Sequence, residues 1–203
     1  MKLAVIIPVY NAENTIRKAV KSIDTTHDVE IICINDGSTD RTKQVLTELQ
    51  KEVKHLIVYH QDNQGAAKSR NMGLSAMSDD IDAFMFLDAD DQFLPGKMDQ
   101  MIQYYEKNEH LDIVIGQIGR GLNGDWKVIP THEDIHREAI VSLAEAPEIL
   151  QSIGPGGKLF KAKFNTLRFD EDVVFCEEHT FVTRAYLMAR DIQLVPFIVY
   201  GYN

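Results

Sequence analysis

The sequence predicts an α/β fold whose central sheet is open and mostly parallel, with helices on both faces. The first observation is a series of short apolar runs without polar alternation, which is typical of strands buried on both faces. The second is their spacing, because the runs begin about 25–30 residues apart, a length that suits βαβ units. The runs cover residues 3–9, 30–34, 56–59, 83–87 and 113–115.

The segments between these runs carry the patterns of helices. Asn11 and Ser38 are of the type that caps helix N-termini, and we expect them to cap the first two helices. A final apolar run over residues 194–200 predicts a last strand close to the end of the chain. Apolar stripes or small residues predict helices over residues 12–23, 45–53, 65–77, 142–151 and 178–190.

The length and composition indicate one globular domain. The chain has 203 residues, of which 44% are hydrophobic and 26% charged, and its formal net charge is −10. Nucleic-acid binding depends on Lys and Arg that neutralise phosphates, so we expect no nucleic-acid partner. An acidic chain that binds an anionic ligand needs a metal ion, backbone N–H groups or a few well-placed cations.

The sequence also predicts the cellular compartment of the protein. The two cysteines, Cys33 and Cys176, suggest no disulfide framework. The N-terminal apolar run is too short for a secretory signal, and no apolar stretch is long enough to span a membrane. We therefore expect a cytoplasmic protein without a transmembrane segment.

Polar residues that follow the first four apolar runs are candidates for a binding site. In open α/β sheets, ligands bind at the carboxyl ends of the strands. Arg70, in the third predicted helix, is either a buried partner of phosphates or a surface cation. The residues that follow the runs are Tyr10, Asn11 and Glu13, then Asp36, then Asn63, and finally Asp88, Ala89 and Asp90.

The acidic sequence Asp88-Ala89-Asp90-Asp91 directly follows an apolar strand. Carboxylates so close together repel one another unless a cation compensates them. Oxygen ligands of this kind suit Mg²⁺ or Mn²⁺, which would leave coordination positions for phosphate oxygens. The alternative is a solvated acidic turn in which Asp91 caps a helix.

Two further patterns each have a functional and a structural interpretation. Glu177 and Glu178 precede the last predicted helix, where a carboxylate is either a general base or an ordinary helix-start residue. His132, Glu133 and His136 fit the zinc-hydrolase pattern H-E-x-x-H. Their flanks lack the long apolar helix that zinc hydrolases bury, so a polar surface turn is favoured.

Taken together, these residues resemble glycosyltransferase family 2, the inverting nucleotide-sugar transferases of the GT-A fold. Any one of the matching motifs is weak, but five occur in order and at the family's spacing over most of residues 3–190. They are P-x-Y-N-x-E at residues 8–13, D-G-S-x-D at 36–40, N-x-G-x-x-x-x-R-N-x-G at 63–73, D-x-D at 88–90 and G-K-L-F at 157–160.

The resemblance implies a role for each matching residue. Asp36 would hydrogen-bond the nucleotide base, usually uracil, and Arg70 would lie near the diphosphate or the base. Asp88 would hold ribose or sugar, and Asp90, with Asp88, would bind the Mn²⁺ or Mg²⁺ that bridges the phosphates. The residues expected to bind the nucleotide sugar are Pro8, Tyr10, Asn11, Glu13, Asp36, Asn63, Arg70, Asp88 and Ala89.

The family's catalytic base lies in a Glu-Asp pair before the last helix, which here is Glu177-Glu178. Glu178 therefore stands where Asp is usual, and either Glu178 or Glu177 is the expected base. Lys158 is expected near the acceptor side. Residues 1–118 would form the half that binds the nucleotide sugar, and residues 119–203 the half that holds the acceptor and the base.

The resemblance implies metal-assisted transfer of a sugar from a nucleotide diphosphate sugar, usually a UDP-sugar, with inversion. The acceptor would be a hydroxyl of a cell-surface glycan or a lipid-linked acceptor, as in capsule or wall teichoic acid. The alternative is a non-catalytic nucleotide-sugar-binding module of a larger cell-wall enzyme. Many relatives continue past this length, so a chain truncated at its C-terminus and peripheral association with the inner face of the membrane are both compatible with the resemblance.

Overall fold

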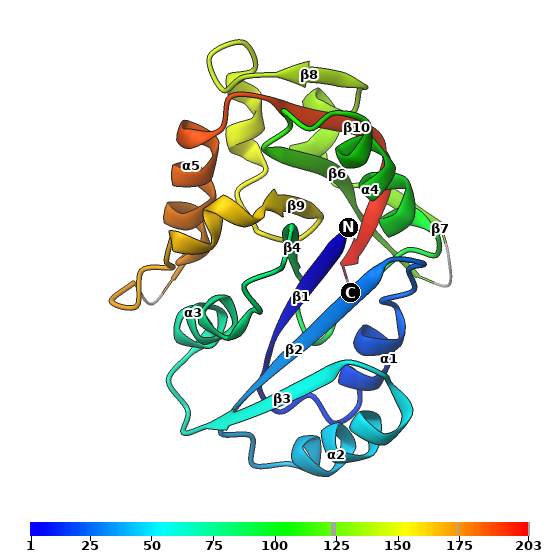
Figure 1. Ribbon diagram of the computed structural model, residues 1–203, viewed down its shortest axis with the longest axis vertical. Helices are drawn as coiled ribbons and strands as arrows, with labels where there is room; N and C mark the ends of the chain where they lie inside the picture. The colour runs from blue at the N-terminus through cyan, green and yellow to red at the C-terminus, as the bar shows by residue number, and fades with distance from the viewer. Residues whose placement is uncertain (123–124, 174, 203) are drawn as a thin grey trace.

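Four parallel strands form one side of the central sheet in the computed structural model, which describes residues 1–122, 125–173 and 175–202 (Figure 1). The register pairs Val9 with Asn35 and Asn35 with His60, so the strands end at the same level. The turns that follow them therefore lie at one edge of the sheet. The strands are β1 (Lys2–Val9), β2 (Asp28–Asp36), β3 (Leu56–Gln61) and β4 (Ala83–Phe86), in the order β3-β2-β1-β4.

The remaining strands join this parallel part mainly through antiparallel pairs. β9 (Lys158–Lys161) lies between β4 and β6 (Ile113–Leu122) and runs antiparallel to both. β10 (Ile192–Tyr202) runs parallel to β6. Three short strands complete the sheet through antiparallel pairs, β5 (Gln92–Phe93) and β8 (Ala139–Val141) with β10, and β7 (Asp125–Val128) with β6.

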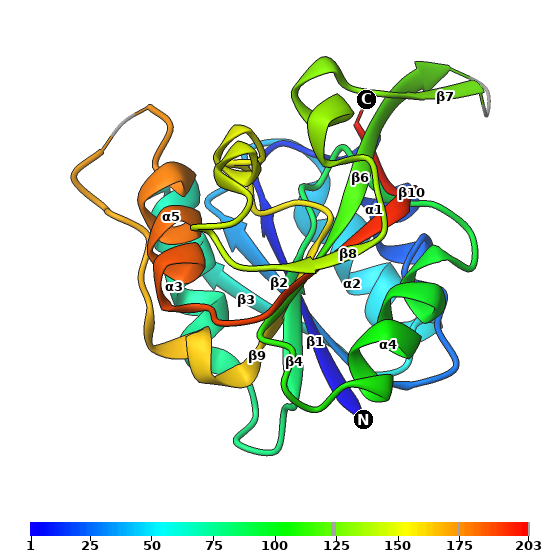
Figure 2. The ribbon, with the colours of Figure 1, turned by 90° about the horizontal axis from the view of Figure 1, so that it is seen from above.

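Helices cover both faces of the sheet, which confirms the predicted α/β fold (Figures 1 and 2). The helices α1 (Ile16–Lys21), α2 (Thr42–Glu52) and α4 (Lys97–Lys107) pack on one face. The helices α3 (Ala66–Ala76) and α5 (Glu178–Met188) pack on the other. None of the helices in the described ranges has both the length and the apolarity that a membrane crossing needs.

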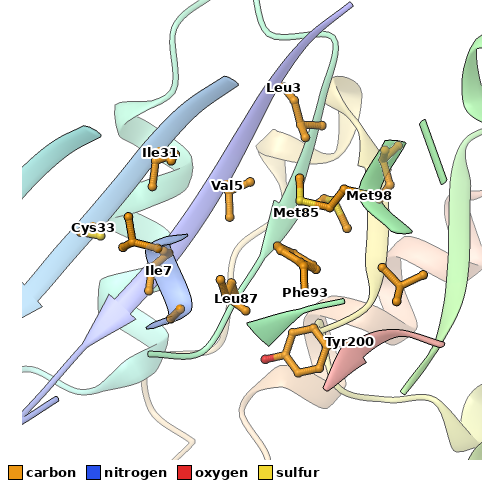
Figure 3. Close-up of a cluster of buried hydrophobic side chains, with 14 of the residues drawn as sticks. Leu3, Val5, Ile7, Ile31, Cys33, Met85, Leu87, Phe93, Met98 and Tyr200 are labelled. Atoms are coloured by element: carbon orange, nitrogen blue, oxygen red, sulfur yellow. The ribbon is translucent and has the colours of Figure 1, made fainter. Parts of the chain in front are cut away.

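The apolar core lies on the two faces of the central strands. Figure 3 shows part of the cluster that faces α1, α2 and α4, in which Phe93 and Tyr200 lie next to each other. Cys33 is fully buried in this cluster, and burial raises the pKa of its thiol. On the other face, a Cβ at Gly73 would lie 2.3 Å from a methyl carbon of Ile6, so only glycine lets α3 approach β1 this closely.

The predicted helix caps are wrong for the first two helices. α1 begins at Ile16 with Thr15 at the N-cap, while Asn11 lies further upstream with a positive φ of 47°. α2 begins at Thr42 with Arg41 at the N-cap. Asn11 and Ser38 instead link the loops after β1 and β2, because the backbone N–H of Asn11 donates to the Ser38 hydroxyl. A short polar side chain satisfies whichever backbone group the tertiary fold brings near it.

Two other regions differ from the sequence prediction. The helix expected over residues 142–151 is reduced to a 3-10 turn at Pro147–Gln151, because Pro147 has no N–H to continue a longer helix. The sequence analysis did not predict α4, although Met98, Met101 and Ile102 are buried at helical spacing. The predicted last strand and last helix are present, with bounds that differ by a few residues.

Candidate functional site

A cleft of about 450 Å³ lies at the edge where β1, β2 and β4 end. Asp36 at its inner end is 4% exposed, whereas Tyr10 at its mouth is 52% exposed. Most of the residues predicted to bind a nucleotide sugar therefore meet in one place. The predicted residues that line the cleft are Pro8, Tyr10, Asn11, Asp36, Arg70, Asp88, Ala89 and Asp90.

Asp36 joins the ends of three elements. One carboxylate oxygen accepts hydrogen bonds from the Gln61 side chain at 2.7 Å and the Gln64 backbone N–H at 2.8 Å. The other accepts from the Gly65 backbone N–H at 2.8 Å, directly before α3. A carboxylate at this position complements the positive end of the helix dipole and the free N–H groups of the first turn. Asp36 thus fixes the turn that forms the inner wall of the cleft.

Glu13 and Asn63, which the sequence also predicts to bind the nucleotide sugar, are not among the residues that line this cleft. Glu13 accepts hydrogen bonds from the backbone N–H and the side chain of Arg41, and these bonds lower the pKa of the Glu13 carboxyl. Asn63 donates to the backbone carbonyl of Asp36 at 3.1 Å. A Cβ on Gly37 would lie 2.6 Å from the backbone nitrogen of Asn63, and Gly37 has a φ of +67°. The close approach of these two loops therefore requires glycine at position 37. Both residues brace loops around the cleft.

Arg70 is buried and pairs with two carboxylates. It donates to Asp88 and to Glu177, each at 2.9 Å, and its guanidinium carbon lies 5.4 Å from the centre of the Phe169 ring. Burial alone would lower the pKa of Arg70, but the two carboxylates outweigh it and raise the pKa. The Nε–H of Arg70 is buried without a hydrogen-bond partner among the described atoms. Arg70 is therefore buried and is not a surface cation, and its partners in the structure are carboxylates.

Tyr200 connects the acidic sequence to β10. Its hydroxyl donates to Asp91 at 2.8 Å and accepts from the backbone N–H of Asp88 at 3.1 Å. Burial, together with the neighbouring Asp88 and Asp91 carboxylates, raises the pKa of Tyr200, which keeps the hydroxyl protonated. The sequence analysis missed Tyr200, because nothing near it in the sequence distinguishes it from a core aromatic residue.

The three acidic side chains differ in their environment, which decides which of them suits a metal ion. Asp91 is 1% exposed and bonded to Tyr200, whereas Asp90 is exposed and Asp88 is half-buried at the cleft. No group of three or more metal-ligating side chains is preformed among the described residues. Mg²⁺ and Mn²⁺ sites often use one or two carboxylates plus substrate phosphates, and Asp88 and Asp90 fit such a shared site.

A second cleft, of about 740 Å³, adjoins the first at Arg70 and Asp88, which line both clefts. Glu178 lines this larger cleft, whereas Glu177 does not and is bonded to Arg70. The lining also includes residues of β6, β7 and the loop of residues 151–156. Of the two predicted candidates for the base, Glu178 is thus the one that faces open space.

Lys158, which the sequence analysis expected near an acceptor, is completely buried and does not line either cleft. Its ammonium group donates to the Ser152 hydroxyl at 2.7 Å and to the Gly154 carbonyl at 2.6 Å. Burial lowers the pKa of Lys158 to about 7. The side chain therefore anchors the 152–156 loop that walls the larger cleft, and it cannot itself reach a ligand there.

The residues of the H-E-x-x-H pattern do not converge. His132 is buried, and its Nδ1 accepts from the Ile118 backbone N–H at 3.3 Å. Burial and the charge of Lys158 lower the pKa of His132 to about 3. His136 bonds to the backbone carbonyl of Pro196, and the segment is a 3-10 turn. The segment is therefore a structural turn, as expected, but it differs from the expected polar surface turn because His132 is buried.

The chain is similar to known glycosyltransferases along its length. The family model described as Glycosyl transferase family 2 matches residues 4–175. The putative glycosyltransferase TagX of Staphylococcus aureus (strain N315) is 38% identical over 207 residues, which cover 100% of this chain and 59% of TagX. A poly(ribitol-phosphate) beta-glucosyltransferase of Bacillus spizizenii is 28% identical over 213 residues, covering 100% of this chain and 32% of that relative. The chain thus spans three fifths or less of the length of these relatives.

Solved structures show the same fold. Crystal structures of S. aureus TarS 1-349 in complex with UDP and with UDP-GlcNAc each superpose on this chain with a TM-score of 0.84 at 24% identity. The superpositions cover 100% of this chain and 60% and 58% of the two TarS chains. At this level of sequence identity, the structural similarity shows a shared fold.

Proposed function

Because the chain belongs to glycosyltransferase family 2, we propose that it transfers a sugar from a UDP-sugar to an acceptor hydroxyl with inversion. The observation that carries the proposal is that two clefts meet at Arg70 and Asp88, with Glu178 in the larger one. The smaller cleft takes the nucleotide diphosphate and the larger one takes the acceptor. The reacting carbon lies where the two clefts join.

The choice of substrates is supported by the relatives. TarS structures contain UDP and UDP-GlcNAc, and this chain has the same fold. One relative, described as a poly(ribitol-phosphate) beta-glucosyltransferase, aligns with the whole of this chain over 32% of its own length. A UDP-sugar donor and a cell-surface glycan or lipid-linked acceptor are therefore the substrates we propose.

Glu178 is the proposed general base. It takes the proton from the acceptor hydroxyl as that oxygen bonds to the anomeric carbon, and the bond to the nucleotide diphosphate breaks on the opposite face. Configuration therefore inverts, and the electron pair of the broken bond leaves with the diphosphate. Glu177 holds Arg70 in place from the other side, which keeps a cation at the junction of the clefts.

Asp88 and Asp90 are the proposed ligands of a Mg²⁺ or Mn²⁺ ion. Such an ion would supply positive charge to stabilise the negative charge of the departing diphosphate. The bond from Arg70 to one oxygen of Asp88 leaves its second oxygen for another interaction, and Asp90 lies exposed at the mouth of the cleft. Asp91 and Tyr200 act as a brace, because their bond fixes the backbone of the acidic turn.

A thermal-shift experiment with UDP, with and without Mn²⁺, tests the donor site. A ligand that binds only the folded state stabilises it by about 2.7 kcal/mol at a hundredfold excess over its dissociation constant. We expect a shift with UDP that requires Mn²⁺ and that is lost in Asp90→Ala. The control is Asp62→Ala, which removes an exposed carboxylate that lines neither cleft.

The same preparation then reports on catalysis. Slow hydrolysis of a UDP-sugar from a panel, measured as UDP release, is expected for the transferase. UDP binding without any hydrolysis or transfer would instead assign the chain to the non-catalytic nucleotide-sugar-binding modules. Absence of a shift with UDP, GDP and dTDP would overturn the proposed donor site altogether.

A further inference from the structure

The larger cleft is lined by side chains of both charges. The carboxylates in its lining are Asp88, Asp91 and Glu178. The lining also includes Arg120 from β6 and Lys127 from β7, and both of these side chains are exposed. In a chain with a formal net charge of −10, two cations side by side at a cleft are an unusual placement.

Arg120 and Lys127 are direct partners across an antiparallel strand pair. The β6–β7 register places them opposite each other. Like charges in this arrangement repel and destabilise the pair of strands, unless an anion lies between or above them. The arrangement thus costs stability in the free protein and gains it when an anion binds.

Neither cation forms an ion pair within the parts of the chain that the structure describes. Four other arginines in those parts do, namely Arg17, Arg41, Arg70 and Arg137, each of which pairs with a carboxylate. Two of the carboxylates that line the cleft are bonded to other groups, since Asp88 pairs with Arg70 and Asp91 accepts from Tyr200. The two cations therefore present their charge to the cleft.

Arg120 is also held in a defined orientation. Its guanidinium carbon lies 4.7 Å from the centre of the Tyr202 ring, and Tyr202 is its register partner on β10. Stacking on a ring uses the flat face of the guanidinium and leaves its edge N–H groups for hydrogen bonds. Those N–H groups form a fork that matches two oxygens of a phosphate group.

We propose that Arg120 and Lys127 form an anion subsite that binds a phosphate group of the acceptor. The acceptor is then a phosphate-bearing glycan or polyol, with the phosphate held by Arg120 and Lys127 while a hydroxyl reaches Glu178. This inference rests on the proposed function, because it takes the larger cleft as the acceptor side. Tyr202 and the apolar residues that line the cleft pack against the uncharged part of the acceptor.

Isothermal titration calorimetry with a synthetic ribitol-phosphate oligomer, in the presence of UDP and Mn²⁺, tests the subsite. Loss of two charge-assisted hydrogen bonds in the double variant Arg120→Ala/Lys127→Ala is expected to weaken binding by about tenfold or more. Added salt should weaken binding to the unmodified protein much more than to this variant, because exposed charges are screened.

The matched control is Lys43→Ala/Lys51→Ala, which removes two exposed lysines of α2 that line neither cleft. It is expected to change oligomer binding by less than about twofold, since distant exposed charges are screened. UDP binding should be the same in all three proteins, which shows that the variants are folded. Equal oligomer binding by the unmodified protein and Arg120→Ala/Lys127→Ala would overturn the subsite.

Two further ligands, a neutral oligosaccharide and farnesyl diphosphate, test which part of the acceptor the subsite binds. A neutral oligosaccharide that binds as tightly as the phosphate oligomer would also overturn the proposal. Farnesyl diphosphate separates the sources of the phosphate, because binding that depends on the two cations would assign the subsite to a lipid-linked diphosphate. If UDP does not bind to the unmodified protein, the proposed function fails. If UDP binds but the oligomer does not distinguish the variants, only the subsite fails.

Discussion

The two clefts are built in different ways, although they share Arg70 and Asp88. The smaller cleft lies at the aligned ends of parallel strands, and its polar residues bond to backbone groups of the neighbouring turn. The larger cleft lies against antiparallel strands, and its walls depend on buried side chains from distant segments, such as Lys158 beneath the 152–156 loop.

The two clefts therefore differ in how substitutions at them affect folding and ligand binding. Around the smaller cleft, Asp36 alone accepts hydrogen bonds from two backbone N–H groups. Its replacement therefore affects the stability of the fold as well as ligand binding. Around the larger cleft, exposed residues such as Arg120 and Lys127 are separate from the buried residues that hold the walls. Changes there can alter the ligand without altering the fold.

The largest expected effect is on catalysis, at the residue that faces the larger cleft. Glu178→Gln removes the proposed base and is expected to slow UDP-sugar hydrolysis by about 10²–10⁴-fold, the usual contribution of general base catalysis. UDP binding should stay unchanged, because Glu178 does not line the smaller cleft. The measurement is UDP release at saturating donor.

Glu177→Gln is the matched variant for this comparison. It keeps a hydrogen-bond acceptor for Arg70 but loses the ion pair, so we expect a smaller loss of rate together with lower stability. A larger loss of hydrolysis in Glu177→Gln than in Glu178→Gln would move the base to Glu177 and contradict the assignment of the larger cleft.

The next effect concerns stability at the smaller cleft. Asp36→Ala leaves the N–H groups of Gln64 and Gly65 without their acceptor, so the free energy of unfolding should fall by about 3 kcal/mol. Urea denaturation measures the change, and UDP binding should weaken in parallel. Asp62 is exposed and directly precedes Asn63, and Asp62→Ala should change the free energy of unfolding by less than about 0.5 kcal/mol. Equal stability of the two variants would show that Asp36 does not brace the cleft.

A further effect is a pH dependence of stability that comes from the buried Lys158 behind the larger cleft. The pKa of Lys158 falls from 10.5 to about 7 in the folded chain, so between these values the unfolded chain binds more protons. The free energy of unfolding should therefore rise with pH across this window, by up to about 1.4 kcal/mol per pH unit.

Lys158→Met should remove this rise, and Lys161→Met, on the same strand, should keep it. Urea titrations at several pH values between 7 and 10.5 measure the slope for each protein. If the slope survives in Lys158→Met, the buried lysine is not its source. UDP binding is expected to be the same in both variants at pH 7, because neither residue lines the smaller cleft.

The sequence by itself was enough for the α/β fold class, the parallel strands and the family resemblance, all of which are confirmed. The reason is that these features are local: apolar runs, their spacing and short motifs are read over a few neighbouring residues. The motif residues at the ends of β1, β2 and β4 also meet as predicted, since parallel strands in one register end at one edge.

Which polar side chains line the clefts and which brace the loops around them depends on long-range packing. Arg70 meets Glu177 across 107 residues of sequence, and Tyr200 meets Asp91 across 109. Lys158 is buried because β9 lies between β4 and β6, and Arg120 faces Lys127 because β7 folds back on β6. Such pairings depend on how distant segments pack, which no local pattern specifies, so the same residue types could equally have been surface charges.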